Sequence, residues 1–134
     1  MGRRILIAED EPSIVVSLEF LLQGAGYEVT TARDGEEALA AARRVTPDLM
    51  VLDVMLPAVN GFEVCRRVRQ VPALRHVPIL FLTARGLENE IKKGLALGAT
   101  AYMTKPFATK ELIRTVGELL RAGKSAPRSG PASA

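Results

Sequence analysis

The chain has 134 residues, 48% hydrophobic and 25% charged, which is long enough for one domain with a substantial core and too short for two comfortable ones. A net charge of only +3 and an aromatic content of 4% argue against direct nucleic-acid binding by this segment. The N-terminal apolar run is too short for a signal peptide, no stretch is long enough to span a membrane, and a single cysteine excludes an internal disulfide, so we expect a cytoplasmic protein.

The chain begins with a predicted strand and an amphipathic helix. Residues 5–8 are all apolar and end at three acids, which is typical of a buried strand that reaches the edge of a sheet. Pro12 suits the first turn of a helix, and the apolar residues that follow repeat on one helical face until Gly24 and Gly26. We therefore expect one strand and one helix before residue 27.

A second strand and helix follow. Residues 28–32 include the β-branched residues that are common in strands. Asp34 and Glu37 have the spacing of a capping box, which indicates the start of a helix. The inward apolar stripe of this helix ends before Pro47, which closes it.

The third strand carries the residue on which the functional prediction depends. Residues 49–52 are uniformly apolar, which favours a strand buried on both faces of a parallel sheet, and Asp53 stands where the chain leaves the core. Ligands of open α/β sheets bind beyond the carboxyl ends of the strands. Asp53 therefore either belongs to such a site or caps the following loop, as aspartate often does, and the strand alone leaves both interpretations open.

The third helix begins after a turn-rich segment. Asn60 and Glu63 again have capping spacing, and the inward valines predict a helix that continues as far as Val71. Residues 72–77 form a connecting loop. This loop contains the only histidine, His76, to which we assign no role because an isolated imidazole in a loop is usually a surface residue.

Two further strands and helices complete the pattern. Residues 78–82 form an apolar strand that ends at Thr83, and the helical spacing after it predicts a fourth helix that stops at Gly98. Gly94 lies inside this helix and should cost it about 1 kcal/mol relative to alanine, so we expect a less rigid element. Residues 101–103 form a brief fifth strand.

The fifth helix is expected to end near Arg121. Residues 122–134 are nearly all small residues, glycine and proline, and cannot bury a face, so we predict a domain over residues 1–121 followed by a disordered tail or interdomain linker. Strand and helix alternate five times, which predicts an α/β three-layer sandwich with a five-stranded parallel sheet.

Polar side chains gather where these strands end: Glu9, Asp10 and Glu11 after the first, Asp53 at the third, Thr83 after the fourth and Lys105 after the fifth. Four carboxylates at one edge repel one another unless a cation joins them, and oxygen ligands without histidine or cysteine favour Mg²⁺. The lysine and the hydroxyl suit a phosphoryl group. The set implies phosphoryl transfer onto a carboxylate, with Asp53 as the isolated acid on the central strand; alternatively, Lys105 merely neutralises the acids.

The chain resembles the receiver domain of bacterial two-component response regulators over residues 3–121. The motifs that carry the resemblance are residues 5–12, residues 53–61, Thr83-Ala84 and Lys105-Pro106-Phe107, in this order and at strand ends. Each motif alone is loose, but the four together are specific. The resemblance implies a flavodoxin-like fold with strand order 2-1-3-4-5.

The resemblance also implies roles for individual residues. Members of the family use an aspartate as phosphoacceptor, Mg²⁺ or in its place Mn²⁺ as cofactor, a lysine that binds the phosphate, and a threonine and an aromatic residue that act as a switch pair. In this sequence these roles fall on Asp53 as phosphoacceptor, Asp10, Asp53 and the Met55 backbone carbonyl as metal ligands, Glu9 as a ligand through water, Lys105 as phosphate-binding lysine, and Thr83 with Tyr102 as the switch pair. Family members often have a cis peptide before the proline that corresponds to Pro106.

Two features depart from the commonest family pattern. Glu9 replaces a more usual aspartate, a variation that should leave metal binding intact. Residues 99–101 are Ala-Thr-Ala where many transcription-factor receivers carry acids that help dimerise the face of the fourth helix, fifth strand and fifth helix, which puts dimerisation by that route in doubt. Met55 and Arg85 fall at variable positions beside the phosphorylation pocket and are expected to tune the lifetime of the phosphate.

The function implied is a phosphorylation-dependent switch in a two-component phosphorelay, with a sensor histidine kinase or histidine phosphotransfer protein upstream and an effector or output domain downstream. It is a regulatory domain and not an enzyme, although slow self-phosphorylation from small phosphodonors and self-dephosphorylation are expected. Three alternatives are weaker. A phosphohydrolase with an aspartyl nucleophile would want a second acid at position 55, which is Met55, and a flavin carrier would want a phosphate-binding loop where three acids follow residue 8. A receiver-like interaction module that works without phosphorylation would not need the full set of site residues.

Overall fold

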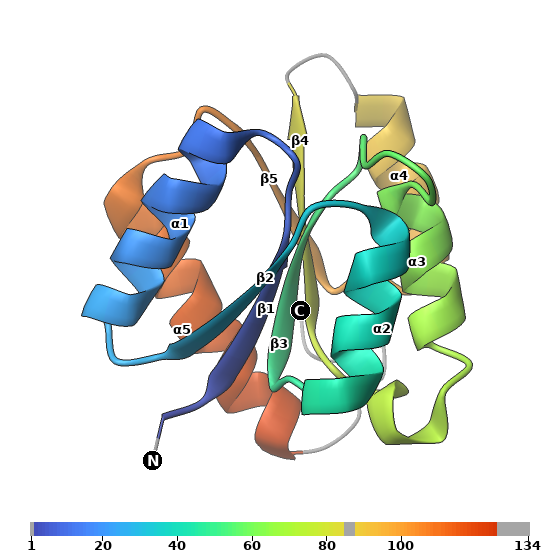
Figure 1. The fold of residues 1–134 in the computed structure, drawn as a ribbon, viewed down its shortest axis with the longest axis horizontal. Coiled ribbons are helices and arrows are strands. Elements are labelled where there is room, and N and C mark those ends of the chain that lie inside the picture. The colour runs from blue at the N-terminus through green and yellow to red at the C-terminus, as the bar shows by residue number, and fades with distance from the viewer. Residues whose placement is uncertain (1, 85–87, 126–134) are drawn as a thin grey trace.

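The structure is a computed structural model that describes residues 2–84 and 88–125. Within this part of the chain, strands and helices alternate as the sequence predicts (Figure 1). The elements in chain order are β1 (Arg4–Ala8), α1 (Pro12–Gly24), β2 (Glu28–Ala32), α2 (Gly35–Val45), β3 (Leu49–Asp53), α3 (Gly61–Val68), the 3-10 turn η1 (Pro72–Leu74), β4 (Ile79–Ala84), α4 (Glu88–Ala96), β5 (Ala101–Lys105) and α5 (Thr109–Ser125).

All five strands are parallel and lie in the order β2-β1-β3-β4-β5, which confirms the predicted flavodoxin-like arrangement. The strand order reverses between β1 and β3, and the register places Ala8 beside Leu52 and Asp53 beside Leu82. Binding sites of doubly wound sheets lie outside the carboxyl ends of the strands at this reversal. The topology therefore brings the ends of β1 and β3 together at the expected place.

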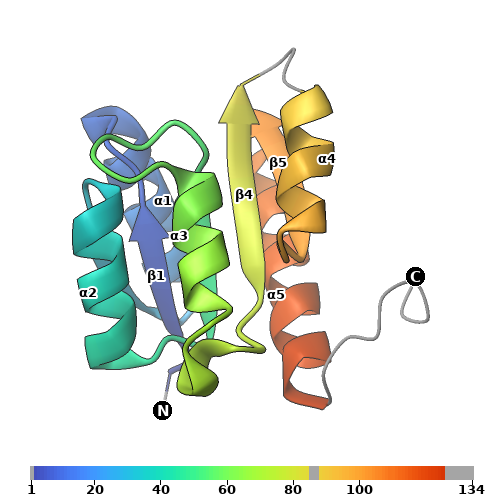
Figure 2. The same cartoon turned by 90° about the vertical axis from the view of Figure 1, so that its right-hand side faces the viewer.

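Helices cover both faces of the sheet and form two separate cores. Helices α1 and α5 pack on one face, and α2, α3 and α4 pack on the other (Figures 1 and 2). Every residue of β3 is buried, because the strand lies in the middle of the sheet with a core on each side. This burial explains its uninterrupted apolar sequence up to Asp53.

Two predicted helix caps are present. The Asp34 carboxylate accepts a hydrogen bond from the Glu37 backbone amide at 2.8 Å, and the Asn60 side chain accepts one from the Glu63 amide at 3.0 Å. Each cap satisfies an amide of the first helical turn that has no partner within the helix. The starts of α2 and α3 are thus fixed by residues that the sequence identified.

Two helix ends differ from the prediction. Helix α3 ends at Val68 and not at Val71, because Pro72 disfavours a helical conformation in the residue before it. Val71 is extended, with φ −89° and ψ 118°. Helix α5 continues past Arg121 to Ser125, since no proline interrupts the chain before position 127. Residues 126–134 lie outside the described residues, so the boundary between domain and tail stays a prediction.

Among the described residues, none of the helices combines the length and the apolar character needed to cross a bilayer.

Candidate functional site

Three acids meet where β1 and β3 end. One carboxylate oxygen from each of Glu9, Asp10 and Asp53 lies within 4.8 Å of the others. Glu9 and Asp53 are buried, with 1% and 5% of their surface exposed, whereas Asp10 is open to solvent. The cluster forms because the ends of two adjacent parallel strands meet at one edge of the sheet.

Glu11, predicted from the sequence as a fourth member of this cluster, lies apart from it. Glu11 is the residue directly before α1. Its carboxylate is exposed and accepts a hydrogen bond from the Ser13 hydroxyl at 3.1 Å. Its backbone amide still serves the site, because it donates to Oε2 of Glu9 at 3.1 Å.

Lys105 reaches the acids from the end of β5. Its Nζ lies 2.9 Å from Oε1 of Glu9 and 3.4 Å from Oδ2 of Asp53. Burial works against the charge of Lys105, but the carboxylates of Glu9 and Asp53 outweigh this effect and raise its pKa. The peptide bond between Lys105 and Pro106 is cis, as the resemblance implied.

The acids outnumber the cation that faces them. Burial raises the pKa of Glu9, and the nearby charge of Asp53 adds to this rise, although Lys105 acts in the opposite direction. Oε1 of Glu9 is buried, and the partner that the described residues place against it is the Lys105 ammonium at 2.9 Å. Three clustered carboxylates that share one ammonium form a donor set that suits a hard divalent cation or its bound water.

The predicted switch residues lie on the two neighbouring strands at the far side of Asp53. Thr83 is fully buried near the end of β4, and its hydroxyl donates to the Ala84 carbonyl at 3.3 Å. Tyr102 on β5 pairs in register with Phe81 and has 46% of its surface exposed. Among the residues that the structure describes, the hydroxyl of Thr83 therefore makes only this local bond, and the aromatic side chain of Tyr102 lies outside the core.

Met55 contacts Asp53 through its backbone. Its backbone amide donates to Oδ1 of Asp53 at 3.1 Å, while its side chain is 69% exposed. The two Asp53 oxygens thus face different partners, the Met55 amide and the Lys105 ammonium. Arg85, the other variable position named from the sequence, lies outside the described residues.

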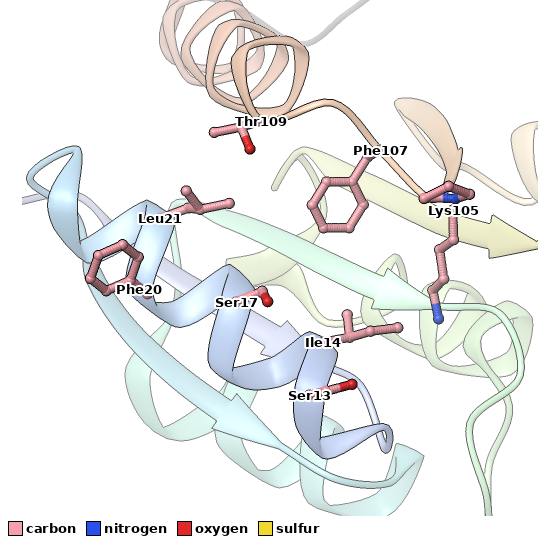
Figure 3. Close-up of a pocket in the computed structure, with 9 residues that line it drawn as sticks. Ser13, Ile14, Ser17, Phe20, Leu21, Lys105, Phe107 and Thr109 are labelled. Carbon is pink, nitrogen blue, oxygen red and sulfur yellow. The ribbon is translucent and has the colours of Figure 1, made fainter.

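An apolar pocket of about 610 Å³ adjoins Lys105. Figure 3 shows it between α1 and the connection from β5 to α5, with Ile14, Leu21 and Phe107 on its walls and Lys105 at one end. Phe20, which also lines the pocket, is 75% exposed. The sequence analysis missed this pocket, although Phe20, an apolar residue outside the inward stripe of α1, was a signal for it.

The strand order and the acidic edge with its lysine define a class of protein: a flavodoxin-like signalling domain with a site suited to a divalent cation and a phosphoryl group. The family comparison agrees, because the profile of the response regulator receiver domain matches residues 5–117. The chain belongs to this family, whose members are phosphorylation-dependent switches of two-component systems.

Individual relatives support the assignment. The chain is 48% identical over 129 residues to the alkaline phosphatase synthesis transcriptional regulatory protein PhoP of Bacillus subtilis, a match that covers 96% of this chain and 53% of that protein. It is 37% identical to the chemotaxis response regulator CheY4 of Vibrio cholerae, with a TM-score of 0.84 and coverage of 89% and 99% of the two chains.

A third relative is informative about the metal. The receiver domain of the sensor histidine kinase PA1611 from Pseudomonas aeruginosa is 34% identical, with a TM-score of 0.84 over 90% of this chain and 99% of that one, and its structure has a magnesium ion coordinated in the active site cleft. The chain spans only about half the length of the curated relatives it matches, such as the 53% of PhoP.

Proposed function

We propose that Asp53 accepts a phosphoryl group from a phosphohistidine of a sensor histidine kinase or a histidine phosphotransfer protein. One carboxylate oxygen of Asp53 forms a bond to phosphorus as the bond from phosphorus to the imidazole nitrogen breaks, and the electron pair of that bond leaves with the imidazole. The observation that carries the proposal is the burial of Asp53 with the Lys105 ammonium 3.4 Å from Oδ2. This charge is placed to bind the phosphoryl oxygens, and Thr83 is the predicted hydroxyl donor.

The metal ion of the proposed site is Mg²⁺, for which Mn²⁺ can substitute. Asp10, Asp53 and the Met55 backbone carbonyl would hold it directly, and Glu9 would act through a bound water. Support comes from the three clustered carboxylates, which face only one ammonium among the described residues, that of Lys105. When bound, the ion supplies positive charge for the oxygens of the transferred group.

Phosphorylation then acts as a conformational switch. The modification adds about 1.5 to 2 negative charges at Asp53. Thr83 moves toward the new oxygens, which requires it to give up only the local bond to Ala84, and Tyr102 turns from its exposed position into the space that Thr83 leaves. The phosphate stabilises a conformation that is already populated to a small extent, and the face around α4 and β5 offered to an effector or output domain changes.

The pocket between α1 and α5 is the proposed docking place of the phosphodonor protein. It opens beside Lys105, and its walls combine Phe107 and Ile14 with the exposed Phe20, so a partner helix with an apolar face can bind there next to Asp53.

The domain is regulatory, and we expect only slow self-phosphorylation from small phosphodonors and slow self-dephosphorylation. We expect the protein to meet its kinase in the cytoplasm.

Incubation with acetyl phosphate and Mg²⁺, followed by intact-mass measurement, tests the phosphoacceptor. We expect the mass of wild type to rise by one phosphoryl group and the mass of Asp53→Asn to stay constant. Lys105→Met is expected to be phosphorylated at least tenfold more slowly, because it lacks the only described cation near Asp53. No gain in wild type would favour the alternative function, a receiver-like interaction module that works without phosphorylation.

Amide chemical shifts of residues 83–104 test the switch. A beryllofluoride mimic of the phosphoryl group should move them in wild type and leave them unchanged in Asp53→Asn. Unchanged shifts in wild type at saturating beryllofluoride would rule out the coupled movement of Thr83 and Tyr102.

A further inference from the structure

The loop between β3 and α3 contains a strained turn. The Val59 amide donates to the Pro57 carbonyl at 2.8 Å, and Ala58 between them has φ +66°. This three-residue pattern with positive φ is a classic γ-turn, which is rare and unfavourable for a residue other than glycine. Such a turn persists only where its surroundings hold it in place.

Gly61 holds one side of this loop against Asp53. A Cβ at Gly61 would lie 2.4 Å from the Asp53 carbonyl oxygen and 2.9 Å from the Val54 Cα, distances that a side chain cannot adopt. The Gly61 amide donates to the Val54 carbonyl at 2.9 Å. The loop therefore folds back directly onto the backbone of the predicted phosphoacceptor, and only glycine permits this contact.

Gly35, the first residue of α2, holds the other side. A Cβ at Gly35 would lie 1.7 Å from the Val59 carbonyl oxygen, and the Gly35 amide donates to the Pro57 carbonyl at 3.1 Å. To reach an ordinary contact of 3.4 Å, the loop would have to retreat by about 1.7 Å. The start of α2 and the start of α3 thus fix the loop from opposite sides.

We propose that Gly35 is a positioning residue for the chemistry at Asp53, although it lies 18 positions away in the sequence and outside the site. It acts through the loop, which carries Met55, and the Met55 amide orients Asp53 by its bond to Oδ1 at 3.1 Å. Displacement of the loop would misplace this amide together with the Met55 carbonyl. Displacements of about 1 Å can lower the rate of an oriented reaction by roughly 100-fold.

The inference rests on the proposed phosphorylation of Asp53, and its test compares three glycine variants in the intact domain. Gly35→Ala and Gly61→Ala introduce the two clashes, whereas Gly24→Ala is the matched control, because its Cβ would meet no atom of the described residues within 4 Å. The initial rate of mass gain with acetyl phosphate is measured over a range of Mg²⁺ concentrations. Circular dichroism and urea unfolding report on the fold of each variant.

We expect Gly35→Ala and Gly61→Ala to remain folded, to react at least tenfold more slowly at saturating Mg²⁺, and to need more Mg²⁺ for half-saturation, while Gly24→Ala matches wild type. A merely structural role would lower stability without moving the Mg²⁺ midpoint of the folded protein. Folded Gly35→Ala with a rate within twofold of wild type overturns the inference. Loss of the fold in both clash variants also overturns it, since the contacts would then be a condition of folding. A wild type that gains no mass would instead refute the proposed function.

Discussion

Gly94 in α4 offers a test of packing in which the sign of the effect is opposite to that expected from helix propensity. On propensity alone, Gly94→Ala should stabilise the helix by about 1 kcal/mol. In the structure, however, a Cβ at Gly94 would lie 2.5 Å from Cε2 of Phe81 and 3.0 Å from Cε1 of Phe62. The two rings pack edge to face with centroids 5.5 Å apart, and Phe81 is only 1% exposed, so neither ring has room to retreat.

The magnitude follows from these two opposing effects. Insertion of a methyl group into a well-packed core typically costs about 1 to 3 kcal/mol, which exceeds the propensity gain of roughly 1 kcal/mol. Because the approach of 2.5 Å to Phe81 is far closer than van der Waals contact, the cost falls in the upper part of this range, about 2 to 3 kcal/mol. After the propensity gain of roughly 1 kcal/mol is subtracted, we expect Gly94→Ala to lower the free energy of unfolding by about 1 to 2 kcal/mol. Gly117 in α5 is the matched control. Within the described part of the chain, the atom nearest to its Cβ would be the flexible end of Arg121 at 3.4 Å.

Urea unfolding followed by circular dichroism provides the measurement. With an m-value of about 2 kcal/mol/M, the Gly94→Ala midpoint should fall by roughly 0.5 to 1 M, whereas the Gly117→Ala midpoint should rise by a few tenths of 1 M. An equal rise in both variants would refute the close packing of α4 on Phe81 and leave helix propensity as the only role of Gly94.

Three further outcomes follow from side-chain contacts. Arg69→Met should lower the free energy of unfolding by about 2 kcal/mol in urea melts, because its guanidinium donates to the Gly98 carbonyl at 2.7 Å and the Val77 carbonyl at 2.7 Å; an exposed control, Arg43→Met, should change little. Arg66 and then Arg67 lower the pKa of Glu63 to about 2. The ionised Glu63 carboxylate therefore stabilises the fold fully above its usual pKa of 4.5, and this stabilisation is lost as the pH falls toward 2. The difference in urea midpoint between wild type and Glu63→Gln should disappear over the same pH range. Burial raises the pKa of Cys65 to about 11, so a thiol reagent at pH 8 should modify it only after unfolding, and rapid modification of the native protein would contradict its burial.

The sequence predicted the fold well because the strands of this domain have little ambiguity. Central strands such as β3 are buried on both faces and are therefore uniformly apolar. The starts of α2 and α3 could be predicted because Asp34 and Asn60 are capping residues. Helix ends were harder to predict. The apolar spacing of valines continues to Val71, but α3 ends at Val68 because Pro72 disfavours helix in the residue before it. The small residues directly after Arg121 include no residue that would end α5.

The candidate site was predictable where it depends on strand ends and was missed where it depends on close packing. The sequence order placed Glu9, Asp53 and Lys105 at one edge, because parallel strands all end there. It could not show that the Glu11 carboxylate turns toward Ser13, since that depends on the first turn of α1. It also interpreted Gly94 only as a weak point of a helix, because the nearness of the Phe81 ring is a tertiary contact that no local pattern records.

The contacts of α4 bear on how the proposed switch would move this helix. Arg69 connects the C-terminal end of α4 to α3 and to the segment before β4, because it donates to the Gly98 and Val77 carbonyls. The Ala99 amide closes the end of the helix by donating to the Gly94 carbonyl at 3.1 Å. Gly94 itself lies against the rings of Phe81 and Phe62. Thr83, in contrast, lies at the end of β4 from which the chain proceeds to the start of α4. If Thr83 moves toward a phosphorylated Asp53, the displacement enters α4 at its N-terminal end while the other end stays fixed, so we expect the helix to tilt about Gly94 and Gly98 and not to shift as a whole.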